Sequence, residues 1–108
     1  MEKTIEKGEK FAVADSVSYS AQSVISRQLL KSEKGNITLF AFDKGEGLSE
    51  HTAPFDAMVL LLDGKAEVMI GGKPNTLQTG DAILMPANIP HALKALERFK
   101  MMLVMIRG

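Results

Sequence analysis

The sequence predicts an all-β fold, either a sandwich or a barrel, for this chain of 108 residues. Short runs of apolar or alternating residues recur along it, as expected for strands. Gly, Asp, Asn and Pro stand between these runs and favour turns because of their backbone preferences. No run keeps the period of about 3.6 residues that marks a helix. The three observations favour several short strands joined by turns.

The first part of the chain is expected to lie outside the barrel core. Residues 1–20 carry mixed charge, a weak apolar run at 11–14 and a group of serines. We expect an arm there that is loosely held, with one short turn or edge strand. The first clear strand pattern is at 23–30, where β-branched and polar residues interleave, and turn residues follow at 31–36.

The later strands follow from apolar runs and the turn residues that end them. Residues 37–42 are apolar on nearly both faces, which is typical of a strand covered on each side. The run 58–62 ends at Asp63-Gly64, and Gly71-Gly72 comes soon after; both pairs predict hairpin turns, since glycine accepts positive φ. Further strands are expected at 65–70, 73–77, 82–85, 91–95 and 101–106, with the charged Glu97-Arg98 separating the last two.

Composition limits the classes of partner. Thirteen basic and thirteen acidic residues cancel and alternate along the chain, so neither nucleic acid nor a membrane is an expected partner. The absence of cysteine excludes disulfides and thiolate metal sites. The N-terminus lacks the apolar core of a signal peptide, and no apolar run approaches the length of a membrane span. We therefore expect a cytoplasmic protein with one domain over residues 1–108.

Two histidines, His51 and His91, are the only ones in the chain. Each follows a turn and lies before or within a run that is typical of a strand. We expect the intervening hairpin to bring the two imidazoles together, which would begin a site, because neutral imidazole binds metals and also acts as an acid or base. No serine has an acid and a histidine at a spacing that suggests a catalytic triad, and the sequence identifies no catalytic residue.

The residues around the histidines resemble the two motifs of the cupin superfamily, which are small jelly-roll barrels. The positions that match are Gly45, His51, Gly64, Gly80, Pro86 and His91. The motif's glycine two positions after Pro86 is replaced by Asn88, which also tolerates a left-handed backbone. The resemblance is to small single-domain cupins of the cupin 2 type. It implies a jelly-roll β-barrel, or double-stranded β-helix, with its core at about 37–106 and an N-terminal arm at 1–20.

The resemblance also implies a metal site of which only part is present. Of the family's four metal ligands, His51 and His91 match, whereas Ala53 and Ala57 stand at the other two positions. A divalent ion usually takes three or four protein donors, and alanine has none. We expect a hollow at these positions. Two outcomes stay open: no metal, or a weakly held divalent metal on the two histidines.

Our first hypothesis for the function is a binding module that holds a small organic ligand, oriented by the two histidines. Glu50 and Asp56 have the wrong strand parity to point into the same pocket, unless the loop is rearranged. The residues expected to wall the pocket are His51, Ala53, Phe55, Ala57, Val59, Leu61, Val68, Met85 and His91.

Two other hypotheses concern catalysis and assembly. The alternative function is a metal-dependent enzyme of dioxygenase or isomerase type that uses His51 and His91 with a non-standard ligand set, although fold alone is weak support for a reaction. Whether the protein is an enzyme is thus left open. The third hypothesis is a structural or assembly role with no ligand, because residues 37–42 and 101–106 are apolar on both faces. We expect a homodimer in which the partner covers one of these apolar faces. Whether the N-terminal strand is exchanged between protomers is not decided by the sequence.

Overall fold

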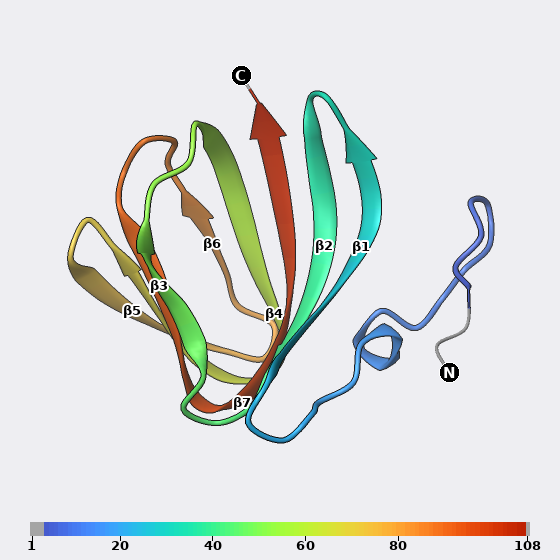
Figure 1. Cartoon of the computed structure of the whole chain (residues 1–108), viewed down its shortest axis with the longest axis horizontal. Helices are drawn as coiled ribbons and strands as arrows, with labels where there is room; N and C mark the ends of the chain where they lie inside the picture. Colours follow the sequence, from blue (N-terminus) through green and yellow to red (C-terminus); the bar gives the residue numbers. More distant parts are fainter. Residues whose placement is uncertain (1–3, 108) are drawn as a thin grey trace.

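Seven antiparallel strands and one short 3₁₀ helix form the part of the chain that the computed structural model describes, residues 4–107 (Figure 1). Residues 1–3 and Gly108 lie outside the described residues. The first three belong to the predicted arm and to the N-terminus that is expected to lack a signal peptide. The strands make an all-β barrel, which confirms the predicted fold class. In chain order the elements are η1 (Ala14–Ser16), β1 (Val24–Ser32), β2 (Gly35–Phe42), β3 (Gly47–His51), β4 (Phe55–Ile70), β5 (Lys73–Gln78), β6 (Ala82–Met85) and β7 (His91–Arg107).

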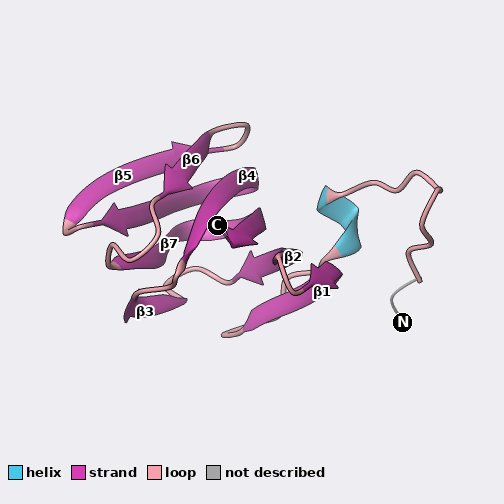
Figure 2. Cartoon of the chain, turned by 90° about the horizontal axis from the view of Figure 1, so that it is seen from above, coloured by secondary structure: helices cyan, strands magenta, loops and turns pink. Residues whose placement is uncertain are grey.

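The two longest strands, β4 and β7, run side by side and give the barrel its shape. They pair from Phe55 opposite Arg107 to Ile70 opposite His91. One half of each strand belongs to a sheet in the order β1-β2-β7-β4-β6, and the other half to a sheet in the order β3-β7-β4-β5. Both strands therefore pass from one sheet to the other, and the strands surround a common interior (Figure 2).

The bend in β4 lies at Gly64, where the sequence predicts a hairpin turn. The register shifts on both sides of Asp63-Gly64 while the pairing with β7 continues, as in a β-bulge. Gly64 has a φ of +92°, and a Cβ on it would overlap the carbonyl oxygen of Arg98. The predicted turn is wrong because two backbones are pressed together at this corner of the barrel, so that 58–62 and 65–70 form one strand.

The strand β7 is continuous as well, although Glu97-Arg98 predicts a break. Three of its residues, 96–98, stand between the partners of Gly64 and Ala66, so the extra length forms a bulge that leaves both charged side chains exposed. In contrast, the hairpin turn predicted at Gly71-Gly72 is confirmed. Both glycines have positive φ, +57° and +79°, and they connect β4 to β5.

Side chains at alternate positions of the long strands fill one end of the barrel. Phe99 and Met101 of β7 are fully buried, and the ring of Phe42 in β2 stacks on that of Phe99 with centroids 4.4 Å apart. The next inward positions of β7, Leu103 and Met105, are only partly buried. Along the same strands, the filled end therefore gives way to a less completely packed interior.

The N-terminal arm covers part of the outer face of the β1-β2-β7-β4 sheet. Val17 is fully buried against Leu39 and Ala41 of β2. The Lys100 ammonium donates a 2.6 Å hydrogen bond to the carbonyl of Ala14, and the Tyr19 hydroxyl donates one to Asp63. The expectation of a loosely held arm is therefore wrong for residues 13–19, because the apolar outer face of β2 needs a cover. The short turn expected in the arm is the helix η1.

No helix among the described residues has the length and apolar character needed to cross a membrane.

Candidate functional site

The strand register brings the two histidines together. His51 of β3 lies directly opposite His91 of β7, and residues opposite each other on an antiparallel pair project to the same face. Their ring centroids are 4.4 Å apart, with an angle of 67° between the ring planes. His91 is 7% exposed, whereas His51 is exposed. The pair thus has one imidazole inside the barrel and one at its mouth.

The loop that precedes His91 is held in place by backbone hydrogen bonds. Asn88, with a left-handed φ of +65°, donates its N–H to the carbonyl of Ala53 at 2.8 Å. The carboxylate of Asp56 accepts a 2.9 Å hydrogen bond from the N–H of Ala87, and the carbonyl of Pro90 accepts one from Gly71. Since Ala53 and Asp56 flank the start of β4, this network fixes the β6–β7 loop against the segment that follows His51.

Each imidazole uses one ring nitrogen to bond its own backbone. Nδ1 of His51 lies 2.7 Å from the carbonyl oxygen of Ser49, and Nδ1 of His91 lies 3.2 Å from that of Ile89. A carbonyl oxygen can only accept, so each Nδ1 must carry the proton. In the neutral ring, Nε2 is then unprotonated and presents a lone pair. Both rings therefore offer a hydrogen-bond acceptor on the side away from the backbone.

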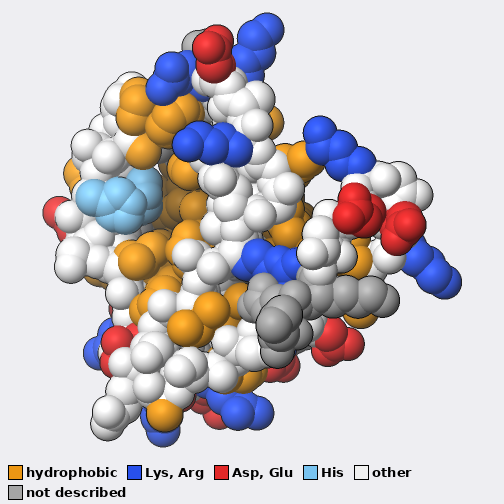
Figure 3. Space-filling model, turned by 45° about the vertical axis from the view of Figure 1, so that its right-hand side comes forward, with side chains coloured by type: hydrophobic (Ala, Val, Ile, Leu, Met, Phe, Trp, Pro, Cys, Tyr) orange, Lys and Arg blue, Asp and Glu red, His pale blue; other side chains and the backbone are white. Residues whose placement is uncertain are grey.

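A cavity of about 470 Å³ opens beside the histidine pair. Most of its wall is apolar, and in Figure 3 the histidines border a hollow flanked by hydrophobic side chains. The cavity is lined by Phe40, Leu48, Ser49, Glu50, His51, Ala53, Phe55, Ala57, Met85, His91, Leu103 and Met105. No Lys or Arg is among these described residues. The polar groups are gathered on β3 and at the start of β7, and the remainder of the wall offers only apolar contact.

The nine residues expected to wall the pocket fall into two groups. Six of them line this cavity: His51, Ala53, Phe55, Ala57, Met85 and His91. Val59, Leu61 and Val68 do not, and the placement of these three in the wall is corrected. They follow Ala57 on the same face of β4, but they are fully buried in the core, where the stacked rings of the filled end leave no space.

Six further residues that line the cavity were not predicted from the sequence: Phe40, Leu48, Ser49, Glu50, Leu103 and Met105. Glu50 shows most clearly why the sequence pattern failed. Its parity predicts that it points away from the pocket, but the pairing of β3 with β7 shifts between Leu48 and His51, so strict alternation does not hold there. Asp56, also set aside on parity, does lie outside this cavity. Leu103 and Met105 continue the inward alternation of β7, a signal that is present in the sequence but is readable only once the register is known.

The donor set does not fit the four-ligand metal centre that the resemblance implies. Among residues 4–107, no group of three or more His, Cys, Asp or Glu side chains is placed to hold a metal ion. Nδ1–H bonds to carbonyls are also how metal-binding histidines are oriented, so orientation alone does not decide against a metal. The number of donor atoms shows that the site does not match a four-ligand centre, because the side chains of Ala53 and Ala57 supply no donor.

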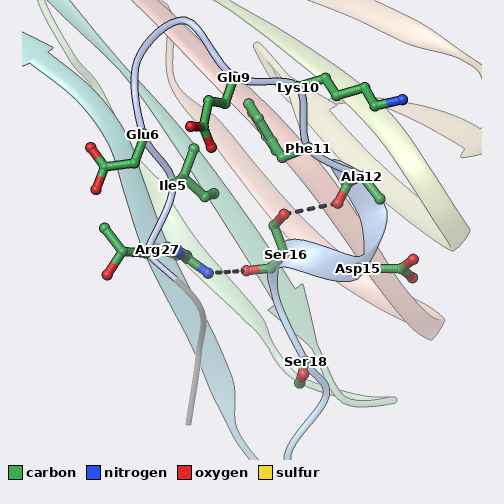
Figure 4. A pocket seen from close by; sticks show the side chains of 11 residues that line it. Ile5, Glu6, Glu9, Lys10, Phe11, Ala12, Asp15, Ser16, Ser18 and Arg27 are labelled. Atoms are coloured by element: carbon green, nitrogen blue, oxygen red, sulfur yellow. Dashed lines mark hydrogen bonds between the residues drawn. The ribbon is translucent and has the colours of Figure 1, made fainter.

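A larger hollow of about 620 Å³ lies between the arm and β1 (Figure 4). Its wall includes Glu6, Glu9 and Phe11, which are exposed, and the guanidinium of Arg27, which donates a hydrogen bond to the carbonyl of Ser16. This hollow has no histidine and is open along the arm. The smaller cavity in the barrel, which combines a buried imidazole with an apolar wall, is the better candidate for a site.

Comparison with known proteins decides the family. A family model described as a cupin domain matches residues 38–107, more than half of the chain. The chain belongs to the cupin family. Its jelly-roll barrel is therefore the one expected from the motif resemblance. A comparison with curated proteins gives no match.

Several solved structures are similar to this cupin. The conserved protein SPY1581 of Streptococcus pyogenes, of unknown function, has 36% identity over 99% of this chain and 94% of its own, with a TM-score of 0.92. A cupin superfamily protein of Desulfitobacterium hafniense has 27% identity over 100% and 99% of the two chains, with a TM-score of 0.90. A cupin 2 conserved barrel domain protein of Leptotrichia buccalis has 38% identity over 90% of this cupin and 47% of that chain, with a TM-score of 0.88. None of the names of these three proteins states a ligand or a reaction.

Proposed function

We propose that this cupin binds a small organic molecule in the cavity beside His51 and His91. The observation that carries the proposal is the combination of two paired imidazoles with an apolar hollow of about 470 Å³. Ligand pockets commonly have volumes of roughly 300–1,000 Å³ and apolar walls with a few convergent polar groups. The apolar wall would supply most of the binding free energy, and the imidazoles would set the orientation of the ligand.

A cavity-filling variant tests the proposal. Wild-type protein is first screened by thermal shift against a library of small metabolites and divalent metals. Ala53→Leu places three more carbon atoms into the cavity wall, and Ala82→Leu, the same change at an exposed position of β6, is the control. We expect compounds that raise the melting temperature of the wild type and of Ala82→Leu but not of Ala53→Leu. The proposal fails if no compound stabilises the wild type, or if Ala53→Leu responds as the wild type does.

We also propose that a second copy of the chain covers part of the outer face of the β1-β2-β7-β4-β6 sheet. Leu84 is 73% exposed and Ile106 is 60% exposed, and together with Met58 and Val104 they line a shallow apolar hollow. An apolar partner surface is needed there, and a two-fold axis would supply the same patch from an identical chain. Because Val17 and Tyr19 already pack on the chain's own sheet, the arm stays with its own protomer in this proposal. A cytoplasmic location and a single domain stay predictions from the sequence.

A further inference from the structure

We infer that the molecule held beside His51 and His91 is neutral, has an apolar and preferably aromatic body, and donates hydrogen bonds from hydroxyl groups at one end. This inference rests on the proposed function and names the class of ligand. Phenols and catechols are its simplest members.

The first step concerns the direction of the hydrogen bonds. Both Nδ1 atoms are engaged with the carbonyl oxygens of Ser49 and Ile89, so the two Nε2 atoms are left as acceptors. No described side-chain nitrogen or oxygen is both fully buried and without a partner, and no other residue among 4–107 makes a hydrogen bond to Nε2 of His91. That atom is consequently accessible, although its residue is buried. A ligand that enters the cavity and donates a hydrogen bond to this atom replaces the hydrogen bond that solvent would otherwise make.

The second step concerns charge. Glu50 is the one ionisable side chain besides the histidines among the residues that line the cavity, and no Lys or Arg lines it. A carboxylate or phosphate ligand would thus meet a carboxylate and two lone pairs, with no cation to bind. The guanidinium of Arg107 lies 5.0 Å from the ring centroid of Phe55, which lines the cavity. Its positive charge opposes a cationic ligand and offsets Glu50, so a neutral molecule is favoured.

The third step concerns shape. Phe40 and Phe55 contribute rings to the wall, and Leu48, Leu103 and Met105 contribute flexible apolar side chains. Aromatic and thioether groups pack well on a flat ring. With the two imidazole rings only 4.4 Å apart at their centroids, adjacent hydroxyl groups on one ring can address both Nε2 atoms. A vicinal diol on an aromatic ring therefore matches both imidazole acceptors, and of the polar side chains that line the cavity only Ser49 and Glu50 are left without a role.

A series of matched probes tests the inference on protein freed of metal by dialysis against EDTA. Catechol, 2-methoxyphenol and 1,2-dimethoxybenzene keep one skeleton and offer two, one and no donors; benzoate and benzylamine carry a negative and a positive charge. By calorimetry or ligand-observed NMR, we expect affinity to fall along the methylated series by on the order of tenfold in all, and both charged probes to bind no better than the dimethoxy compound. Equal binding across the series, or tighter binding of either charged probe, overturns the inference.

Two further measurements separate this inference from the proposed function. His51→Phe keeps an aromatic ring at the mouth but removes its acceptor, so the preference for catechol over the dimethoxy compound should shrink while Ala53→Leu abolishes binding of both. If benzoate binds wild type and not Ala53→Leu, the cavity binds ligands and only the class is wrong. Long-range ¹H–¹⁵N NMR of the histidines is expected to show protonated Nδ1 and unprotonated Nε2 in the neutral rings. Protonated Nε2 on both neutral rings would overturn the class directly.

Discussion

The Tyr19 hydroxyl donates a 2.6 Å hydrogen bond to the carboxylate of Asp63, which joins the N-terminal arm to the bulge of β4. The guanidinium of Arg98 lies 4.5 Å from the centroid of the same ring, as in a cation–π contact. Residues far apart in the chain thus meet where both long strands bend. This contact ties the position of the arm to the corner on which the barrel depends.

Replacing Tyr19 by phenylalanine removes the hydroxyl but keeps the ring. We expect a loss of about 0.5–1 kcal/mol in the free energy of unfolding, measured by urea denaturation, because the lost hydrogen bond is solvent-exposed. Ser18→Ala, at an exposed neighbouring position, is the control and should change little. If Tyr19→Phe is as stable as the wild type, the hydrogen bond contributes nothing to the free energy of unfolding.

The same residue predicts a pH dependence. Burial, and then the hydrogen bond to Asp63, raise the pKa of the Tyr19 phenol above its ordinary value of 10.0. The folded state therefore resists ionisation, and this contribution to stability is present below pH 10 and is lost as the pH rises toward the raised pKa. We expect the urea midpoint of the wild type to fall more steeply above about pH 10 than that of Tyr19→Phe. Parallel curves would contradict this.

Asp43 predicts a dependence at the acidic end. Its carboxylate accepts hydrogen bonds from the N–H groups of Gln22 at 2.7 Å and Lys44 at 2.9 Å, and these bonds lower its pKa. Its contribution is present above the ordinary pKa and is lost as the pH falls through the lowered one. The melting temperatures of wild type and Asp43→Asn should differ near neutral pH and converge below about pH 3. Glu33→Gln, in the exposed β1–β2 turn, should not show this convergence.

Gly64→Ala tests the corner of the barrel. The new Cβ would overlap the carbonyl of Arg98, and φ at this position is +92°, so we expect destabilisation of at least about 2 kcal/mol by denaturant titration. Gly72→Ala is the matched control, because φ there is +79° but no atom lies within 4 Å of its Cβ. Equal losses for the two variants would mean that backbone strain acts alone and that the close approach has no effect.

Adding donor atoms tests the account of the metal. We expect wild-type protein, dialysed and then measured by elemental analysis, to hold less than stoichiometric transition metal, since two histidines are too few ligands. The double variant Ala53→His with Ala57→Glu supplies the two missing donors and should retain about one divalent ion per chain. Ala53→His alone is the intermediate control. A stoichiometric metal in the wild type would refute the donor count.

A charge on the apolar outer face tests the homodimer. Leu84→Lys places an ammonium at the 73% exposed side chain, where the proposed partner would have to bury it. Light scattering coupled to size exclusion should show a dimer for the wild type and a monomer for the variant. Thr76→Lys, at an exposed position of β5 on the other sheet, should leave the dimer intact. A monomeric wild type at micromolar concentration would contradict the proposal.

Local patterns predicted most of the strands, and their failures share one cause. Alternation and turn residues located β6 and the Gly71-Gly72 hairpin because these depend on a few neighbouring residues. The breaks expected at Asp63-Gly64 and Glu97-Arg98 did not occur, since a bulge and a turn use the same residue types. Which of the two forms is decided by the partner strand, and the partner is not local in sequence.

The sequence by itself determined the all-β class and the family motifs. It also determined that the four metal-ligand positions of the motifs hold two histidines and two alanines, and hence that metal donors are too few. Only the tertiary structure decided which side chains face the hollow. It placed Glu50, Leu103 and Met105 in the wall and left Val59 in the core. The physical reason is that strand register, bulges and the direction of each imidazole's hydrogen bond arise from contacts between distant segments, and period-two alternation carries no information about where along the barrel the packing ends.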